Sequence, residues 1–365
     1  MPVLKKIVVQ DFRNIAFQEL EFSPNINCIS GNNGEGKTNL LDAIYCLSMT
    51  KSAFSQPDRY NCRYGTDSFV IGGTFRMENE TDSRFSIKFS PEGKKLIRDD
   101  KPYSKISDHI GVLPVVMISP SDISMVSESG EERRRFANSV LSQMDREYLA
   151  AAQVYTRLLA ERNKLLKSGA ADDDLLEVFD LRMQPAAETI YLGRKRLTED
   201  LLPAVKNYYS IVSGGAEDVS IEYRSDISGV SLSDLFRSRR EKDRIFGYTT
   251  AGVQRDDFVF KMNSHPVRHF GSQGQQKSFL VALKFAQYDI MKRAYGFPPT
   301  LLLDDVFDKL DMTRIANLIS MVAGSDFGQI FITDSNKVRL SGIVDRITED
   351  RAYFDTAAGV FTKLD

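Results

Sequence analysis

Residues 31–38 read Gly-Asn-Asn-Gly-Glu-Gly-Lys-Thr, and this segment constrains the fold more than any other. It follows a short apolar run, Ile26–Ser30, that predicts a strand, and it precedes residues 39–47, whose apolar spacing predicts a helix. A phosphate-binding loop of the G-x-x-x-x-G-K-[ST] type requires this strand–loop–helix context. The sequence therefore predicts a nucleotide site formed by consecutive residues: Gly31, Asn32, Asn33, Gly34, Glu35, Gly36, Lys37 and Thr38.

The residue types in this loop suit a phosphate group. Glycines allow successive backbone N–H groups to turn inward, and the N-terminus of the following helix adds partial positive charge. Lys37 is expected to reach the β- and γ-phosphates of the nucleotide. The Thr38 hydroxyl is expected to ligate Mg²⁺.

Composition sets limits on what surrounds this loop. The chain has 365 residues, 42% hydrophobic and 27% charged, which is typical of one large or two moderate globular domains. Its net charge of −2 means that any contact with nucleic acid must come from local basic patches. The three cysteines lack metal-ligand spacing, and no apolar run approaches the ~20 residues that span a bilayer. We expect free thiols and a cytoplasmic protein.

The pattern of apolar residues divides the chain. Strands are predicted at 3–12, 19–22, 69–75, 85–89 and 113–118. Residues 131–167 contain no Gly or Pro and predict one long helix with a coiled-coil-like seam, followed by a second helix at 175–202. Paired as an antiparallel hairpin, these helices would be about 40–55 Å long. Two helices of an ordinary core are an equally good interpretation.

The last hundred residues alternate helix and strand, with helices predicted at 275–294 and 313–322 and strands at 300–304 and 329–333, which predicts a parallel sheet. Its apolar strand 300–304 ends in Asp304 and Asp305. A buried parallel strand delivers its C-terminal end to the ligand crevice, so Asp304 is expected to hold Mg²⁺. Asp305 is expected to polarise the attacking water, which makes Lys37, Asp304 and Asp305 the candidate catalytic residues.

A second candidate segment, Gly-Ser-Gln-Gly-Gln-Gln-Lys, occupies residues 271–277 ahead of an Ala- and Leu-rich helix. Ser272 can cap this helix, and Gly274 allows close approach of a ligand to the backbone. The segment is therefore either a simple helix N-cap or a second anion site.

Together these motifs resemble the RecF family of SMC-type ABC ATPases. The resemblance extends to 11–14 (Asp-Phe-Arg-Asn), 114–122, 133–136 and 155–165, and it covers nearly the whole chain. It implies an α/β fold: an ABC-type ATPase head, with a mixed sheet and flanking helices, plus an α-helical second lobe carrying a short antiparallel helical hairpin. The head would comprise 1–118 together with 245–365, and the helical lobe 119–244.

The resemblance also implies a mechanism. Two heads would sandwich two ATP molecules with Mg²⁺, so that ATP drives homodimerisation. Ser272, Gly274 and Gln275 of one subunit would clasp the γ-phosphate bound by the other, and Arg13 would lie near the nucleotide. The family implies sequence-independent binding of double-stranded DNA and gap junctions, slow hydrolysis, and work with RecR and RecO in loading RecA.

Several residues depart from the family pattern. Val253-Gln254 stands where the family commonly has Pro-His, Thr333-Asp334 where transporter ATPases place a switch His, and Asp305 where those enzymes use Glu. No Q-loop glutamine is identified. Slow hydrolysis agrees with the replacement at Asp305.

Other interpretations stay open. A phosphate-loop ATPase that drives protein assembly without binding DNA is the main alternative. A transporter ATPase fits less well. The basic runs 133–135 and 237–244 contain acidic residues, so they predict either DNA contacts or ion-paired helix surfaces. His265 and His269 are four apart, but Pro266 argues against a helical metal pair.

Overall fold

The computed structural model describes residues 1–54, 57–128, 130–169, 172–215, 217–306, 327–337, 342, 344–345 and 348–364. Its contacts divide the chain into two compact units. Unit 1 comprises Met1–Ser121 and Gln287–Asp365, and unit 2 comprises Asp122–Ala286. The sequence-based boundary at 244 assigns residues 245–286 to the head, whereas their contacts group them with the middle of the chain.

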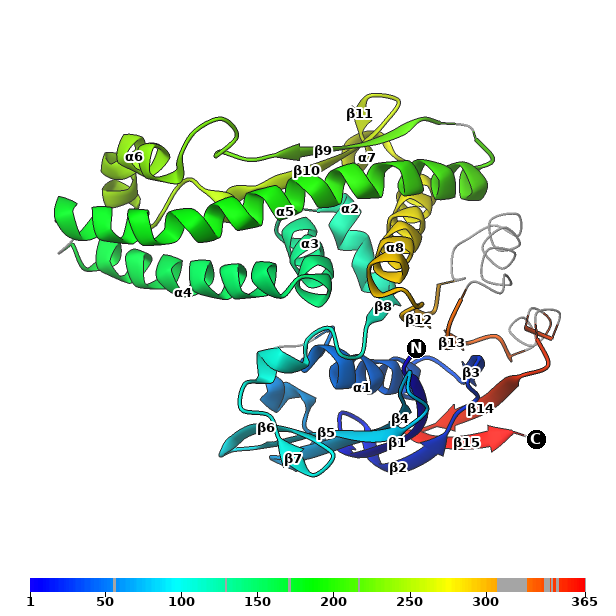
Figure 1. Ribbon diagram of the computed structural model, residues 1–365. Coiled ribbons are helices and arrows are strands. Elements are labelled where there is room, and N and C mark those ends of the chain that lie inside the picture. The colour runs from blue at the N-terminus through cyan, green and yellow to red at the C-terminus, as the bar shows by residue number, and fades with distance from the viewer. Residues whose placement is uncertain are drawn as a thin grey trace. The chain divides into compact units, whose positions relative to one another are not determined.

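Unit 1 contains an antiparallel sheet with strand order β2-β1-β4-β5-β6-β7 (Figure 1). Alternate residues along its strands are buried, as in Phe69, Ile71 and Phe75 of β4. This period of two is that of a sheet with one apolar face. The strands are β1 Val3–Phe12, β2 Ile15–Glu21, β4 Phe69–Arg76, β5 Asp82–Ser90, β6 Gly93–Arg98 and β7 Lys101–Pro102.

The second sheet of unit 1 has the order β15-β14-β3-β13-β12-β8, with parallel pairing throughout except for the β14–β15 hairpin. The predicted parallel sheet is confirmed. The predicted helix at 313–322 lies outside the described residues. The strands are β3 Ile26–Ser30, β8 Val115–Ile118, β12 Thr300–Asp304, β13 Ile330–Asp334, β14 Arg351–Ala357 and β15 Val360–Leu364.

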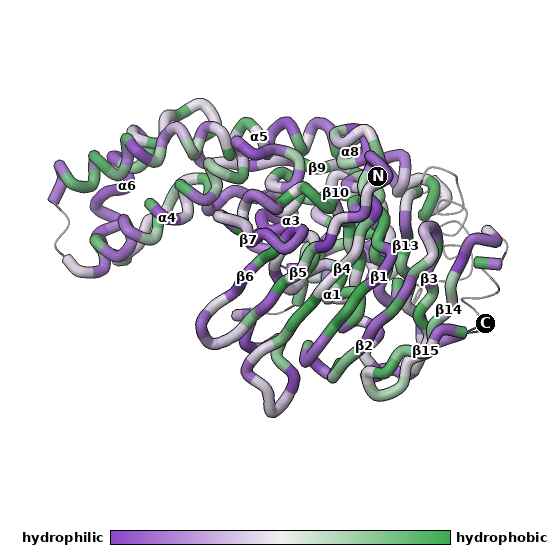
Figure 2. The backbone as a smooth tube through the Cα atoms, turned by 60° about the horizontal axis from the view of Figure 1, so that its bottom comes forward, coloured by the Kyte–Doolittle hydropathy of each residue, from purple (hydrophilic) through white to green (hydrophobic). Residues whose placement is uncertain are grey.

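Helix α1, Lys37–Met49, packs against strands of both sheets. Leu40, Leu41 and Leu47 are fully buried on it and belong to the same apolar cluster as both sheets. Figure 2 shows hydrophobic residues concentrated in α1 and the strands around it. Because β3 is buried along its whole length, the loop that joins it to α1 is held at the carboxyl edge of the parallel strands.

Unit 2 is mainly helical, with a small antiparallel sheet of order β11-β10-β9. The unit boundary falls within α8. The elements are α2 Ser124–Ser127, α3 Gly130–Met144, α4 Arg146–Ser168, α5 Asp173–Ser213, β9 Val219–Arg224, α6 Leu232–Phe246, β10 Asp257–Met262, β11 His265–Pro266, α7 Val267–Phe270 and α8 Gln273–Tyr295. Short 3₁₀ turns are η1 Asp58–Asn61, η2 Ile106–His109, η3 Pro120–Ile123 and η4 Val253–Arg255.

The prediction of one unbroken helix at 131–167 is wrong. The segment forms α3 and α4, which are separated at Asp145. The Asp145 carboxylate accepts hydrogen bonds from the backbone N–H groups of Glu147 and Tyr148, so it caps α4. The second helix is longer than predicted, because α5 continues past Pro203 to Ser213. Helices α4 and α5 lie side by side, which confirms the hairpin (Figure 1).

One buried arginine joins three helices of unit 2. The Arg162 guanidinium, from α4, donates to Asp180 of α5 at 3.0 Å and to Asp243 of α6 at 2.8 Å. It also donates to the Thr249 hydroxyl at 2.7 Å and lies over the Phe236 ring. The predicted seam comprises positions 141, 144, 148, 151, 155, 158, 162 and 165. Arg162 is its one charged residue, and it is fully buried.

We predict that Arg162→Met destabilises the chain by about 3–5 kcal/mol, because two buried carboxylates lose their shared cation. Arg237→Met is the control, since Arg237 is 61% exposed and its partners lie at the surface. That change should cost about 0–1 kcal/mol. The midpoint of urea unfolding, followed by circular dichroism, measures both. Equal midpoints for the two variants would contradict the prediction.

Candidate phosphate-binding site

The loop between β3 and α1 needs glycine at two positions. Gly31 and Gly36 have φ angles of 155° and 111°. A Cβ on Gly31 would lie 2.6 Å from the Thr356 carbonyl oxygen, and one on Gly36 would lie 2.8 Å from the Asn14 side-chain oxygen. Both the backbone conformation and the space therefore exclude larger residues.

The outer side of the loop is held by the turn of the C-terminal β-hairpin. The Glu35 carbonyl accepts hydrogen bonds from the Gly359 N–H at 2.8 Å and the Thr356 hydroxyl at 3.2 Å. The Glu35 carboxylate accepts from the Ala358 N–H. These contacts link residues more than 300 positions apart, and hydrophobic periodicity gave no sign of them.

A second brace comes from the turn between β1 and β2. The Asn14 side-chain oxygen accepts from the Asn39 amide at 2.7 Å and lies against Gly36. Sequence reasoning singled out neither asparagine for the site. The only available signal was the position of Asn14 beside Arg13 in the family-like segment 11–14.

Lys37 and Thr38 begin α1 with their side chains directed into the site. Lys37 is buried, and its Nζ donates to the carbonyl oxygens of Gly31 at 2.8 Å and Asn32 at 3.0 Å. The Thr38 hydroxyl lies 2.9 Å from both carboxylate oxygens of Asp304. The structure therefore brings together the lysine, the hydroxyl and the strand-end aspartate that the sequence motifs singled out.

Asp304 and Asp305 lie in different environments. Asp304 is buried and accepts a hydrogen bond from the Thr333 hydroxyl at 2.8 Å. Burial raises the pKa of the Asp304 carboxyl, and the hydrogen bonds from Thr333 and Thr38 oppose that rise. Asp305 turns away with φ 45°, and its N–H donates to the same Thr333 hydroxyl at 3.0 Å.

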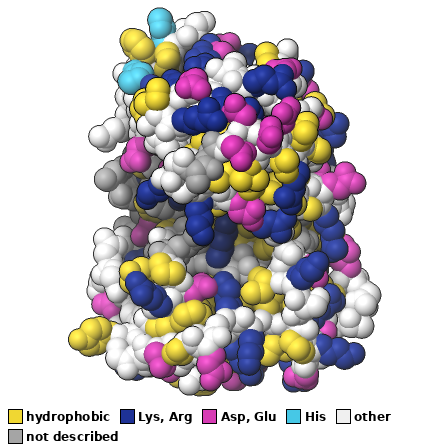
Figure 3. Space-filling view, turned by 90° about the vertical axis from the view of Figure 1, so that its left-hand side faces the viewer, with side chains coloured by type: hydrophobic (Ala, Val, Ile, Leu, Met, Phe, Trp, Pro, Cys, Tyr) yellow, Lys and Arg dark blue, Asp and Glu magenta, His cyan; other side chains and the backbone are white. Residues whose placement is uncertain are grey.

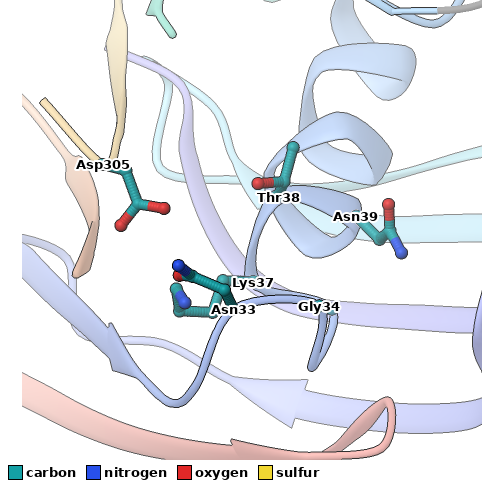
Figure 4. A pocket seen from close by; sticks show the side chains of 7 residues that line it. Asn33, Gly34, Lys37, Thr38, Asn39 and Asp305 are labelled. Atoms are coloured by element: carbon teal, nitrogen blue, oxygen red, sulfur yellow. The ribbon is translucent and has the colours of Figure 1, made fainter. Parts of the chain in front are cut away.

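Asp305 lines a cavity of about 210 Å³. Figure 4 shows its carboxylate, the Thr38 hydroxyl and the Lys37 side chain around one space, with Asn39 directed away. The volume is below the range typical of a complete drug-sized ligand, so the cavity suits the phosphate part of a nucleotide. Its lining residues are Asn33, Gly34, Gly36, Lys37, Thr38, Asn39 and Asp305.

Arg13 does not belong to that lining. Its guanidinium donates to Asp42 of α1 at 2.7 Å and to the Ser52 hydroxyl at 2.9 Å. Asp42 is fully buried, and burial raises the pKa of its carboxyl while Arg13 lowers it. In this structure Arg13 therefore anchors the helix that follows the phosphate loop.

Ser272, Gly274 and Gln275 lie at the start of α8, in unit 2. The Ser272 hydroxyl accepts from the Gln275 N–H at 3.3 Å, and the Gln275 side chain accepts from the Ser272 N–H at 2.8 Å. This reciprocal pair is a capping box. The interpretation of Ser272 as a helix cap is therefore confirmed, and the cap leaves the first turn of α8 with a defined shape.

The two basic runs of the sequence are largely paired. Arg133 is buried and donates to Asp257, and Arg135 pairs with Glu131 and Glu132. In the second run, arginines pair with acidic residues of α5 and α6; the pairs are Arg237 with Asp234 and Glu177, Arg240 with Asp173 and Asp180, and Arg244 with Asp173 and Glu241. Figure 3 shows positive and negative side chains interleaved over these helices.

The residues that replace the family's Pro-His are packed inside unit 2. The Tyr155 hydroxyl donates to the Gln254 side-chain oxygen, and the Gln254 amide donates to the Ala251 carbonyl at 2.6 Å. Arg194 donates to the Val253 carbonyl, also at 2.6 Å. Gln254 therefore connects α4 to the segment that leads into β10.

The described residues contain no group of three or more His, Cys, Asp and Glu side chains placed to hold a metal ion. His269 accepts from Arg268, and His265 packs against the Phe270 ring. All three cysteines are free thiols. None of the described helices is both long and apolar enough to cross a bilayer.

Comparisons with known proteins agree with this geometry. Residues 3–349 match the family described as "RecF/RecN/SMC N terminal domain". The chain is 40% identical to the DNA replication and repair proteins RecF of Bacteroides thetaiotaomicron and Parabacteroides distasonis, over 99% and 98% of both chains respectively.

Solved structures extend the comparison. A structure titled as the recombination mediator protein RecF with ATP in the RecFOR pathway has a TM-score of 0.89 at 28% identity, covering 100% of this chain and 98% of that one. The Smc head domain of Pyrococcus furiosus has a TM-score of 0.60 at 14% identity, covering 100% and 96%. The second likeness concerns the fold alone, which is that of an SMC-type ABC ATPase head.

The bracing of the loop predicts an effect of Gly359→Ala. The new Cβ would collide with the Asn14 carbonyl oxygen, so the hairpin turn must shift and the hydrogen bond from the Gly359 N–H to Glu35 is disturbed. We expect the affinity for a fluorescent nucleoside triphosphate, measured by titration, to fall about tenfold, which corresponds to ~1.4 kcal/mol.

Gly65→Ala is the matched control. Gly65 has a similar φ of 85°, and a Cβ there meets nothing within 4 Å. This variant carries the same backbone strain without the collision, so its affinity should stay within about twofold of the unmodified chain. Equal losses in both variants would show that the bracing does not shape the loop.

Proposed function

Because the chain belongs to the RecF family, we propose that it is an ATP-dependent switch of recombinational DNA repair. It binds ATP and Mg²⁺, dimerises, holds DNA, and releases it after slow hydrolysis. The observation that carries this proposal is the meeting of the phosphate loop with the end of β12, where the Thr38 hydroxyl lies 2.9 Å from Asp304. The relatives named RecF and the solved structure of RecF with ATP support the proposal.

In this proposal the phosphates of ATP occupy the cavity beside Asn33 and Gly34. Lys37 exchanges its hydrogen bonds to two loop carbonyls for contacts with the β- and γ-phosphates. The helix dipole of α1 and the backbone N–H groups of the loop add to the attraction. Asp305 faces the same cavity and orients the attacking water, which agrees with slow turnover.

Thr38 and Asp304 fit Mg²⁺. Both offer oxygen ligands, which this hard cation prefers. The raised pKa of Asp304 shows that burial disfavours its negative charge, and a divalent cation stabilises the ionised form. When bound, Mg²⁺ would neutralise charge on the β- and γ-phosphates.

The dimer would use the start of α8. Ser272, Gly274 and Gln275 form the capped first turn of a 23-residue helix, which is a suitable anion-binding terminus. We infer that this turn meets the γ-phosphate bound by a second copy of the chain. ATP would then hold two heads together, and hydrolysis would separate them.

The proposal of DNA and of helper proteins as partners rests on family membership. We propose sequence-independent binding to double-stranded DNA, including gap junctions, and cooperation with RecO and RecR in loading RecA within the bacterial cytoplasm. The near-neutral net charge and the paired basic runs keep one alternative open: a switch that drives protein assembly without DNA.

Sedimentation with and without ATP–Mg²⁺, in the presence of a gapped duplex, separates the two functions. We expect a monomer without nucleotide and an ATP-dependent dimer that co-sediments with DNA. A dimer that ignores DNA would leave the nucleotide chemistry in place and favour the assembly switch. A chain that stays monomeric with ATP would contradict both.

A pair of variants at Ser272 tests the proposed dimer contact. Asp and Asn both cap helices as well as Ser, so neither change should unfold the first turn of α8. Ser272→Asp places a negative charge against the γ-phosphate and should abolish the ATP-dependent dimer in sedimentation. Ser272→Asn should retain it, and both should bind ATP as monomers. Dimerisation of the Asp variant would rule out this contact.

A further inference from the structure

One part of the antiparallel sheet of unit 1 carries an excess of positive charge. Residues 82–105, which include β5, β6 and β7, carry seven Lys and Arg but four Asp and Glu, in a chain whose net charge is −2. Figure 3 views the β6–β7 edge of this sheet, and Lys and Arg side chains are spread over it. The segment contains no long basic run, so sequence inspection did not single it out.

The strand register places two of these charges together. Lys88 of β5 lies directly opposite Lys95 of β6. Their neighbours Ile87 and Leu96 are also opposite each other and are buried, so the two lysines lie on the outer, solvent-facing side of the sheet. Both lysines are exposed. Like charges directly opposite each other destabilise an antiparallel pair, since their Cβ atoms are about 4.5–5.5 Å apart.

Three other lysines of the same sheet are neutralised by carboxylates. Lys5 pairs with Asp82 at 2.7 Å, Lys6 with Glu19 at 2.6 Å, and Lys94 with Asp58 at 2.7 Å. No ion pair is found for Lys88 or Lys95 within the described part of the chain, which includes every residue of the sheet. The repulsion between these two lysines is therefore left for an external anion to relieve.

The surroundings favour a polyanion over a folded protein partner. Val70 lies opposite Lys88, and Gly72 lies opposite Ser86, so the adjoining positions of β4 and β5 carry small side chains and no large apolar anchor. Arg84 extends the positive charge four residues along the same face of β5, about 14 Å from Lys88. At the opposite edge of the sheet, Glu19 on β2 neutralises Lys6, so positive charge without an ion pair is found on the β5 and β6 side.

We propose that the outer face of β5 and β6, centred on Lys88 and Lys95, binds the phosphate backbone of double-stranded DNA. The inference rests on the proposed function and names the surface that carries it out. Flexible lysines meet phosphates as point charges without reading bases, so this contact is independent of sequence.

The test compares two double variants of the full chain with ATP–Mg²⁺ bound. Lys88→Gln/Lys95→Gln removes the unpaired charges, and Lys5→Gln/Lys6→Gln removes the same charge from paired positions of the same sheet. Duplex affinity is measured by fluorescence anisotropy at several salt concentrations. Each phosphate contact contributes about 0.9 to the slope of log K against log salt, so the first variant should lose nearly two units of slope and the control almost none.

Thermal unfolding of the same variants provides a second readout. Removing the Lys88–Lys95 repulsion should leave the melting temperature equal to or above that of the unmodified chain, whereas breaking two ion pairs in the control should not raise it. Loss of DNA binding together with a lowered melting temperature would point to damage to the fold and overturn the proposal.

The remaining outcomes are equally decisive. Equal slopes for the Lys88/Lys95 variant and the unmodified chain would overturn the surface while leaving the proposed function intact. Equal losses of slope in both variants would show a general charge effect and also overturn it. If polyglutamate binding depends on the two lysines and duplex binding does not, the partner is an acidic protein. An unmodified chain that binds no duplex would contradict the proposed function itself.

Discussion

The candidate site depends on one buried carboxylate. Asp304 ends β12 and accepts hydroxyl hydrogen bonds from Thr38 of α1 and Thr333 of β13, so three elements of unit 1 meet at a single charge. Burial raises its pKa above the value in the unfolded chain. The protonated form of Asp304 therefore favours the folded chain. This contribution to stability is lost as pH rises through the folded-state pKa and Asp304 ionises. The fold tolerates this loss at the place where a cation would remove it, which is typical of a site built for function.

Unit 2 shows the opposite use of buried charge. Arg162 lies among Asp180, Asp243 and Thr249 and donates a hydrogen bond to each of them. The ion pairs of Arg162 join α4, α5 and α6, and Arg240 of α6 adds pairs with Asp173 and Asp180 of α5. A polar group within an apolar helix seam fixes the register of the helices at some cost in stability. Arg162 therefore aligns helices, whereas the proposed function gives Asp304 a role in binding Mg²⁺, although both are buried charges.

Much of the fold and the centre of the site could be predicted from the sequence, because both rest on local signals. The apolar period of two, the phosphate loop with its flanking elements, and the Asp304–Asp305 strand end are each visible within a few residues. What was missed depends on long-range geometry. The bracing of Glu35 by Gly359 joins distant segments, and the break at Asp145 needs the backbone hydrogen bonds that a capping carboxylate accepts. The resemblance implied that Arg13 lies near the nucleotide, and no sequence pattern indicated its pairing with Asp42.

The location of unpaired positive charge is also set by long-range geometry and could not be predicted from the local sequence. Neighbouring arginines of a basic run point in different directions around the helix. Arg133 and Arg135 of α3 therefore meet different carboxylates, and Arg237 of α6 likewise pairs with an acidic residue. Lysines seven residues apart on neighbouring strands, in contrast, become adjacent through the β5–β6 register. The electrostatic field that attracts a polyanion comes from the basic side chains that have no ion pair. Neither the net charge nor a run of basic residues in the sequence predicts where these side chains lie. The proposed DNA-binding surface of this chain therefore follows from the strand register and not from the basic runs.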